Sequence, residues 1–213
     1  MASLYFRYGA MNCGKTVSLL QVAHNYEENG LKVVLLKPSK DTKGEGKVVS
    51  RIGVERNADY LIAEDEEILS HIEKWKEENV ACILVDEAEF LQPKQIVELH
   101  KISKFYDIPV ICYGIRTNYR GEPFEGSIQL MVWADAIEKY VNLCSCGSKA
   151  EFQGRKVNGE FVVEGEEVLI DGSSASVEYV PLCGKCFLEK VYSKIERLET
   201  AKPKQLTLKK IDY

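Results

Sequence analysis

The stretch GAMNCGKT (residues 9–16) has the spacing G-x-x-x-x-G-K-T. Glycines let the backbone curl so that several N–H groups face one centre, and the N-terminus of a following helix attracts an anion. In this pattern Lys15 neutralises the β- and γ-phosphates of a nucleotide, and the Thr16 hydroxyl is a ligand of Mg²⁺. The stretch follows a strand-like segment and opens a helix-like one, so we favour a phosphate site over a simple glycine turn. The predicted phosphate-binding residues are Gly9, Ala10, Met11, Asn12, Cys13, Gly14, Lys15 and Thr16.

Two acidic residues follow an apolar run in ILVDEAEF (83–90). The carboxyl end of a parallel strand faces the ligand crevice, where Asp86 and Glu87 would then lie. Successive strand residues point in opposite directions, so the two acids have different roles if the strand persists to both. Alone, they would be ordinary solvated charges at a strand end. Beside the phosphate turn, we favour a Mg²⁺ ligand and a base for phosphoryl transfer.

Four of the seven cysteines form two tight pairs, Cys144-x-Cys146 and Cys183-x₂-Cys186, with 36 residues between the pairs. Four thiolates suit a closed tetrahedral Zn²⁺ site, which is a structural site. Free buried thiols or a redox pair are the alternatives. A bound zinc would clamp both ends of residues 147–182 and hold them as a loop that could close over a second substrate.

Strand-like and helix-like segments alternate through the first two thirds of the chain. Continuous apolar strands that alternate with helices predict an α/β domain with a parallel sheet. The predicted strands are 2–8, 32–38, 80–87 and 108–114. One predicted helix begins at Lys15 and stops at Asn29-Gly30. Two others span residues 66–77 and 93–106. Residues 39–56 are polar and contain glycine, which predicts a mobile loop.

This alternation ends near residue 141, which predicts three parts: a nucleotide-binding domain (1–141), a small zinc-binding domain (142–190) and a tail (191–213). KVNGEFVV (156–163) carries an Asn-Gly hairpin signal within the small domain. The tail is rich in Lys and Glu. We expect its first part to be helical and its end to be mobile.

The composition restricts the class of protein. A chain of 213 residues that is 45% hydrophobic suffices for one core and a small appendage. A net charge of −5 without a basic run disfavours a nucleic-acid binder. No apolar run reaches the roughly 18 residues of a membrane span, and no export signal opens the chain, which favours the cytoplasm.

Several longer stretches are more specific than the phosphate pattern: GAMNCGKT (9–16), SRIG (50–53), LVDEAEFL (84–91), CYGIRTNYRGEPFEGS (112–127), CSCG (144–147) and YVPLCGKCF (179–187). With them the chain resembles the cytosolic, zinc-containing thymidine kinase family over nearly its whole length. The resemblance implies a RecA-like P-loop NTPase sheet flanked by helices, with a zinc-binding domain whose lasso-like loop covers the substrate. It implies transfer of a phosphoryl group from ATP to the 5′-hydroxyl of thymidine or deoxyuridine, in nucleotide salvage. It also implies a homotetramer inhibited by dTTP.

The resemblance assigns roles to residues as well. Glu87 would be the general base and Asp86 would lie near Mg²⁺ with Thr16, while Ala88 and Glu89 would complete the nucleotide site. Arg155 and Lys43 would be charge partners of phosphates. The implied substrate-binding residues are Met11, Phe90, Tyr119, Phe124, Val168, Leu169, Ile170, Asp171, Gly172 and Tyr179.

Some positions depart from the family. Glu89 stands where the family usually has Gln, Gln153 lies where a small or apolar residue often faces the 5-methyl group, and segment 170–179 is longer. These changes leave open a deoxynucleoside kinase of altered base specificity. Two further alternatives are a P-loop ATPase in which Glu87 orients water, and a zinc-ribbon nucleic-acid module, against which the acidic charge argues. Dependence of ADP formation on an added nucleoside separates the kinase from the ATPase.

Overall fold

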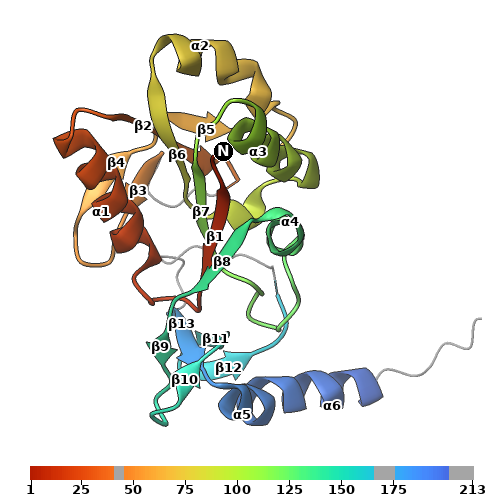
Figure 1. The fold of residues 1–213 in the computed structure, drawn as a ribbon. Coiled ribbons are helices and arrows are strands. Elements are labelled where there is room, and N and C mark those ends of the chain that lie inside the picture. The colour runs from red at the N-terminus through yellow and green to blue at the C-terminus, as the bar shows by residue number, and fades with distance from the viewer. Residues whose placement is uncertain (41–45, 166–175, 202–213) are drawn as a thin grey trace, which may run out of the picture.

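The centre of the molecule is a six-stranded parallel sheet in the order β5-β2-β6-β7-β1-β8 (Figure 1). The computed structural model describes residues 1–40, 46–165 and 176–201. The strands of this sheet are β1 (Leu4–Tyr8), β2 (Lys32–Pro38), β5 (Tyr60–Ile62), β6 (Val80–Val85), β7 (Val110–Gly114) and β8 (Ala136–Lys139). The predicted α/β class with a parallel sheet is confirmed.

Helices cover both faces of the sheet. In Figure 1, α1 lies on the opposite side of the sheet from α3 and α4. The helical elements of this part are α1 (Lys15–Glu28), the 3₁₀ helix η1 (Ile68–His71), α2 (Ile72–Glu77), the 3₁₀ turn η2 (Ala88–Phe90), α3 (Pro93–Phe105) and α4 (Glu125–Trp133). The predicted starts at Lys15 and Pro93 are confirmed, and α3 has the expected proline in its first turn.

Two cores explain why the strands read as continuous apolar runs. Val34 and Leu36 of β2 pack in the core on the α2, α3 and α4 side, whereas Val33 and Leu35 pack in the core on the α1 side. The same alternation holds along β6 and β7. Because successive strand residues face opposite ways, a sheet covered on both faces needs apolar residues at every position.

Three predictions about elements need correction. Within residues 39–56, predicted as a loop, β3 (Lys47–Val49) pairs with β4, which runs from Glu55 to Asn57. Val48 of this hairpin is buried in the α1-side core. The predicted helix over 66–77 begins as a 3₁₀ helix, and the predicted strand 80–87 ends at Val85.

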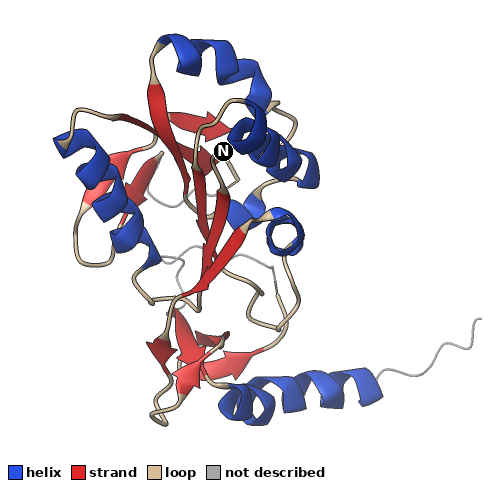
Figure 2. Cartoon of the chain, viewed as in Figure 1, coloured by secondary structure: helices blue, strands red, loops and turns tan. Residues whose placement is uncertain are grey.

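Below the sheet in Figures 1 and 2 lies a smaller unit of short strands and helices with its own apolar cluster. Its elements are β9 (Asn142–Leu143), β10 (Lys149–Ala150), β11 (Phe152–Val157), β12 (Glu160–Val162), β13 (Val177–Leu182), α5 (Gly184–Phe187), the π-helical turn η3 (Leu188–Tyr192) and α6 (Ser193–Ala201). The Asn158-Gly159 hairpin is confirmed, since both residues have positive φ and join β11 to β12. The boundary at 141/142 stays a prediction.

A membrane span is absent from the part of the chain that is described: none of its helices is both long and apolar enough to cross a bilayer.

Candidate functional site

The phosphate turn lies between β1 and α1, as its pattern requires. Gly14 caps α1 at φ 86°, and Asn12 also has positive φ, at 65°. The Lys15 ammonium donates to the carbonyls of Gly9 and Ala10, both at 3.1 Å, and lies 3.7 Å from the Cys13 sulfur. Lys15 therefore lies over the loop, where a phosphate would replace these weaker acceptors.

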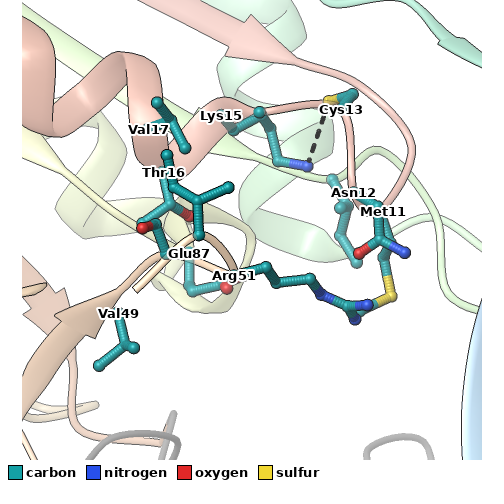
Figure 3. Close-up of a pocket in the computed structure, with 13 residues that line it drawn as sticks. Met11, Asn12, Cys13, Lys15, Thr16, Val17, Val49, Arg51 and Glu87 are labelled. Atoms are coloured by element: carbon teal, nitrogen blue, oxygen red, sulfur yellow. Dashed lines mark hydrogen bonds between the residues drawn. The ribbon is translucent and has the colours of Figure 1, made fainter. Parts of the chain in front are cut away.

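The turn opens into a cavity that also contains Glu87 (Figure 3). Three neighbouring strands of the sheet supply it, because β7 lies between β1 and β6 and all three end at the same edge. The lining residues are Met11, Asn12, Cys13, Gly14, Lys15, Thr16, Val17, Val49, Ser50, Arg51, Ile52, Glu87 and Ile115. This arrangement brings a cationic phosphate loop and a carboxylate into one space.

Sequence reasoning missed the wall formed by residues 49–52 and Ile115. Ser50 begins a tight turn, in which its hydroxyl donates to the Val54 carbonyl and accepts from the Val54 N–H. This turn directs Arg51 toward the phosphate loop in Figure 3. The available signals were the stretches SRIG (50–53) and CYGIRTNYRGEPFEGS (112–127), to which the resemblance assigned no role at residues 50–52 or Ile115.

The smaller unit, which contains β9 to β13, contacts the phosphate loop directly. The half-buried Asn142 side chain donates to the Met11 carbonyl at 3.0 Å. Ala10 is 3% exposed and packs in the same apolar cluster as Cys144, Cys183 and Cys186. A Cβ on Gly9 would lie 2.7 Å from the Tyr140 carbonyl, which explains the glycine there. The phosphate loop is thus packed against the cysteine-bearing segment.

Replacing Asn142 with alanine is expected to raise the KM for the nucleotide about three- to tenfold. The change removes one hydrogen bond to the loop, of the order of 1 kcal/mol, and leaves the Met11 carbonyl without this donor. Steady-state kinetics against nucleotide concentration measure the effect. Asn25→Ala, an exposed change on α1, is the matched control. An unchanged KM for Asn142→Ala would show that this bond does not contribute to the nucleotide-binding conformation of the loop.

The acidic residues lie on a turn, since the strand stops before them. Asp86 is buried, and its N–H donates to the Leu36 carbonyl at 3.1 Å. Glu87 has φ 48°, in the left-handed region. The strand-alternation argument therefore does not apply, and this backbone turn sets the direction of Glu87 instead. Asp86 does not line the cavity, whereas Glu87 does.

Glu89 was expected at the nucleotide, yet its side chain is buried. Only 2% of Glu89 is exposed, and its Oε2 accepts from the Ile115 N–H at 3.2 Å. Burial raises its pKa well above the ordinary value, and the neighbouring Glu87 raises it further. Ala88 is also fully buried, and neither residue lines the cavity.

Aromatic residues gather in two places among the predicted substrate contacts. The rings of Phe90 and Phe124 pack edge to face with centroids 5.5 Å apart. Tyr119 lies under the Arg155 guanidinium, at 3.7 Å from its ring centroid, and donates to the Gly165 carbonyl at 3.1 Å.

Arg155 also holds the chain just before residue 166. Its Nη2 donates to the Glu164 carbonyl at 2.6 Å, and Tyr179 of β13 lies opposite it in the register. Arg155 is 1% exposed and does not line the cavity with the phosphate loop. Its predicted contact with phosphates therefore finds no support in its position.

Some predicted contacts cannot be placed. Lys43, Val168, Leu169, Ile170, Asp171 and Gly172 lie outside the described residues. Gln153, predicted near the base, is 2% exposed and donates to the Thr117 carbonyl.

The four paired cysteines come together as predicted. Their sulfur atoms all lie within 4.8 Å of one another, and those of Cys146 and Cys183 are 3.6 Å apart. Zn–S bonds of 2.3 Å in a tetrahedron require sulfurs about 3.8 Å apart, so the cluster fits Zn²⁺. Positive φ at Gly147 lets its N–H donate to the Cys144 carbonyl at 2.8 Å, which forms the tight turn between the first pair and the following strand.

The chemistry of these thiols also suits a cation. Hydrogen bonds from the Ser148 backbone and side chain lower the pKa of Cys146 to about 6. Hydrogen bonds to the sulfurs of Cys144, Cys183 and Cys146 raise the pKa of Cys186 to about 12. Four adjacent thiols cannot all ionise without a cation between them, and a divalent metal supplies that charge.

Comparison with known proteins agrees with this geometry. A family model described as "Thymidine kinase" matches residues 2–187. A thymidine kinase of Francisella tularensis subsp. holarctica is 41% identical over 197 residues, which cover 90% of this chain and all of the relative. Thymidine kinases of Shewanella oneidensis and Streptococcus gordonii are also 41% identical, over 90% and 89% of this chain and 100% and 97% of their own lengths.

Proposed function

This chain belongs to the thymidine kinase family, and we propose that it transfers the γ-phosphoryl group of ATP to the 5′-hydroxyl of thymidine to give dTMP. The observation that supports this reaction is the single cavity that contains both the phosphate loop and Glu87. Phosphoryl transfer needs a charge-neutralising cradle for the donor and a group that accepts the proton of the attacking hydroxyl. Lys15 and the loop N–H groups supply the first, and Glu87 supplies the second.

In this reaction Glu87 accepts the 5′-hydroxyl proton while the oxygen attacks the γ-phosphorus and ADP leaves. The left-handed backbone at Glu87 directs its carboxylate into the cavity, away from the strand direction. Thr16 lines the cavity, and its hydroxyl would hold Mg²⁺, which would neutralise the phosphate oxygens. Asp86 is the second proposed ligand and rests on the family resemblance, because it does not line the cavity. The predicted zinc would be structural, because four cysteines leave no open ligand position.

An acceptor-dependence assay tests this proposal. Radiolabelled phosphate transfer and ADP formation would be measured with thymidine, deoxyuridine, deoxycytidine or no acceptor. We expect turnover with thymidine and with deoxyuridine, and ADP formation at least 100-fold slower without an acceptor. Equal ADP formation with and without a nucleoside would instead support the ATPase alternative.

Altered base specificity is the second candidate, and Gln153 is the observation that favours it. This polar side chain is buried and bonded to the Thr117 carbonyl, two residues along β11 from Arg155. A larger kcat/KM for deoxyuridine than for thymidine in the same assay would favour a site that disfavours the 5-methyl group.

The remaining expectations stay predictions. A homotetramer rests on the family resemblance. Exposed apolar side chains on α4 and on the edge strand β8, namely Ile128, Val132 and Ile137, would suit an interface between copies but do not set their number. Inhibition by dTTP and a cytoplasmic location rest on the family resemblance alone.

A further inference from the structure

A second carboxyl group lies beside the proposed base. Glu89 follows Glu87 by two residues on the η2 turn, and Glu87 is the charged side chain that acts on it most strongly. The resemblance placed Glu89 in contact with the nucleotide. Because only 2% of Glu89 is exposed and the residue does not line the cavity, its presence on this turn needs another explanation.

Backbone from two other elements packs closely against Glu89 and its turn. A Cβ on Gly114 would lie 2.6 Å from Glu89 Oε2, and a Cβ on Gly126 would lie 2.7 Å from the backbone carbonyls of Ala88, Glu89 and Leu91. Glycines at the end of β7 and in α4 thus allow the turn to pack tightly. The Ile115 N–H satisfies Oε2, and the Ser127 hydroxyl holds the Ile115 carbonyl at 2.6 Å. The carboxyl group is therefore fixed in place.

The other oxygen of this carboxyl lacks a usual donor. Among the described residues, Oε1 is buried and has no hydrogen-bond partner that donates to it. An ionised carboxylate accepts hydrogen bonds only, so burying this oxygen without a donor is costly. A protonated carboxyl group carries its own donor and can place it on the neighbouring Glu87 oxygen.

Pairing with a cation does not remove this difficulty. The charged groups that act on Glu89 are Glu87 from the same turn and Lys15 from α1. Gly114 of β7 presents backbone to the carboxyl group, and Gly126 of α4 packs against the backbone of the turn. Lys15 donates to Gly9 and Ala10 and would face phosphates in the loaded enzyme. An ionised Glu89 would then be a buried charge beside a second negative charge, the least favourable arrangement.

We propose that Glu89 is a positioning residue, a buried carboxylic acid that keeps its proton at neutral pH and donates a hydrogen bond to the Glu87 carboxylate. This bond holds Glu87 toward the acceptor hydroxyl whose proton it takes in the proposed reaction. The proposal rests on the proposed role of Glu87 only for its catalytic consequence. The protonation of Glu89 itself is a property of the fold.

Stability against pH tests the protonation without any assay of activity. The folded chain keeps the proton, whereas the unfolded chain releases it above about pH 4.3. Folding then takes up a proton, so stability falls as pH rises toward the raised pKa of Glu89. Between pH 6 and 7.5 the unfolding constant of the native chain should rise about tenfold per pH unit relative to Glu89→Gln and to Glu89→Leu.

Urea unfolding at several pH values measures this difference, with Glu125→Gln, an exposed change at the start of α4, as the matched control that keeps the native slope. Equal pH slopes for the native chain and Glu89→Gln would mean that Glu89 is ionised when folded, and would overturn the proposal. Glutamine reproduces the shape and both hydrogen bonds, so this test stands even if Glu89→Leu does not fold.

Kinetics test the positioning role. Leucine fills the site but donates nothing, so kcat should fall about tenfold with little change in the KM for ATP. Glutamine can donate from its amide to Glu87 and accept from Ile115, so Glu89→Gln should recover most of that loss. If Glu89→Leu turned over as fast as Glu89→Gln, positioning would be excluded although the protonation stood. Failure of the base assignment itself would appear separately, as unimpaired turnover of Glu87→Gln.

Discussion

Replacing Glu87 with glutamine is expected to lower kcat about 10³-fold, within the range of 10² to 10⁴ typical of a general base. The amide has the shape of the carboxylate but cannot accept the 5′-hydroxyl proton. The phosphate loop is untouched, so binding of ATP and of thymidine should change little. Single-turnover kinetics and equilibrium binding of both ligands separate chemistry from affinity.

Glu125→Gln is the matched control for this experiment, because it makes the same chemical change at an exposed position of α4. The pH profile of the native enzyme adds a second readout, since an ionised base gives a rate that falls on the acid side. If Glu87→Gln kept its turnover, the base would have to be another group, and the shared cavity would lose its catalytic interpretation.

Replacing Cys183 with serine is expected to release zinc and to destabilise the chain by more than about 4 kcal/mol. Cys183 accepts from the Cys186 N–H at the start of α5 and lies next to the Cys146 sulfur. Losing the metal would therefore free both the β9–β10 turn and the end of β13. For a chain of this size, 4 kcal/mol corresponds to a fall in Tm of about 8–16 °C.

Elemental analysis gives the metal content, with one zinc per native chain and much less in the variant as the expected result. Cys82→Ala is the matched control, because Cys82 is buried in the α1-side core away from the cluster. It should lose packing energy yet keep its zinc. Native protein purified without chelators that contained no zinc would rule out this structural role.

The zinc prediction extends to the phosphate loop. Ala10 packs in the cysteine-bearing cluster, and Asn142, two residues before Cys144, holds the Met11 carbonyl. Chemical release of zinc should therefore also weaken nucleotide binding. The alanine variant of Asn142 separates the two effects, since it breaks the link while leaving all four sulfurs in place.

Local patterns in the sequence were enough to predict four of the six strands of the central sheet and the helices α1, α2 and α3, but not β5, β8 or α4. They also indicated the residues of both candidate sites. Lys15 and Thr16 could be placed because the G-x-x-x-x-G-K-T spacing dictates a strand, a turn and a helix within a few residues. The four cysteines could be grouped because metal ligands come in closely spaced pairs. The α/β class followed from continuous apolar strands, which only a sheet covered on both faces requires.

Elements with short or non-local signals escaped sequence reasoning. The strands of the β3–β4 hairpin are three residues long, too short to show a period, and Val48 is buried by distant residues. The edge strand β8 was missed for a similar reason, since it has only four residues, three of which are exposed.

The environment of each acidic side chain was decided by tertiary structure alone. In sequence, Asp86, Glu87 and Glu89 are three carboxylates in four residues. In the fold, Glu87 faces the cavity because its backbone turns left-handed, while Glu89 is sealed by Gly114 and Gly126 from two other elements. Spacing along the chain determines which groups can act, but the burial of Glu89 comes from residues far away in sequence. The proposed division between a base, Glu87, and a carboxyl group that keeps its proton, Glu89, rests on that burial.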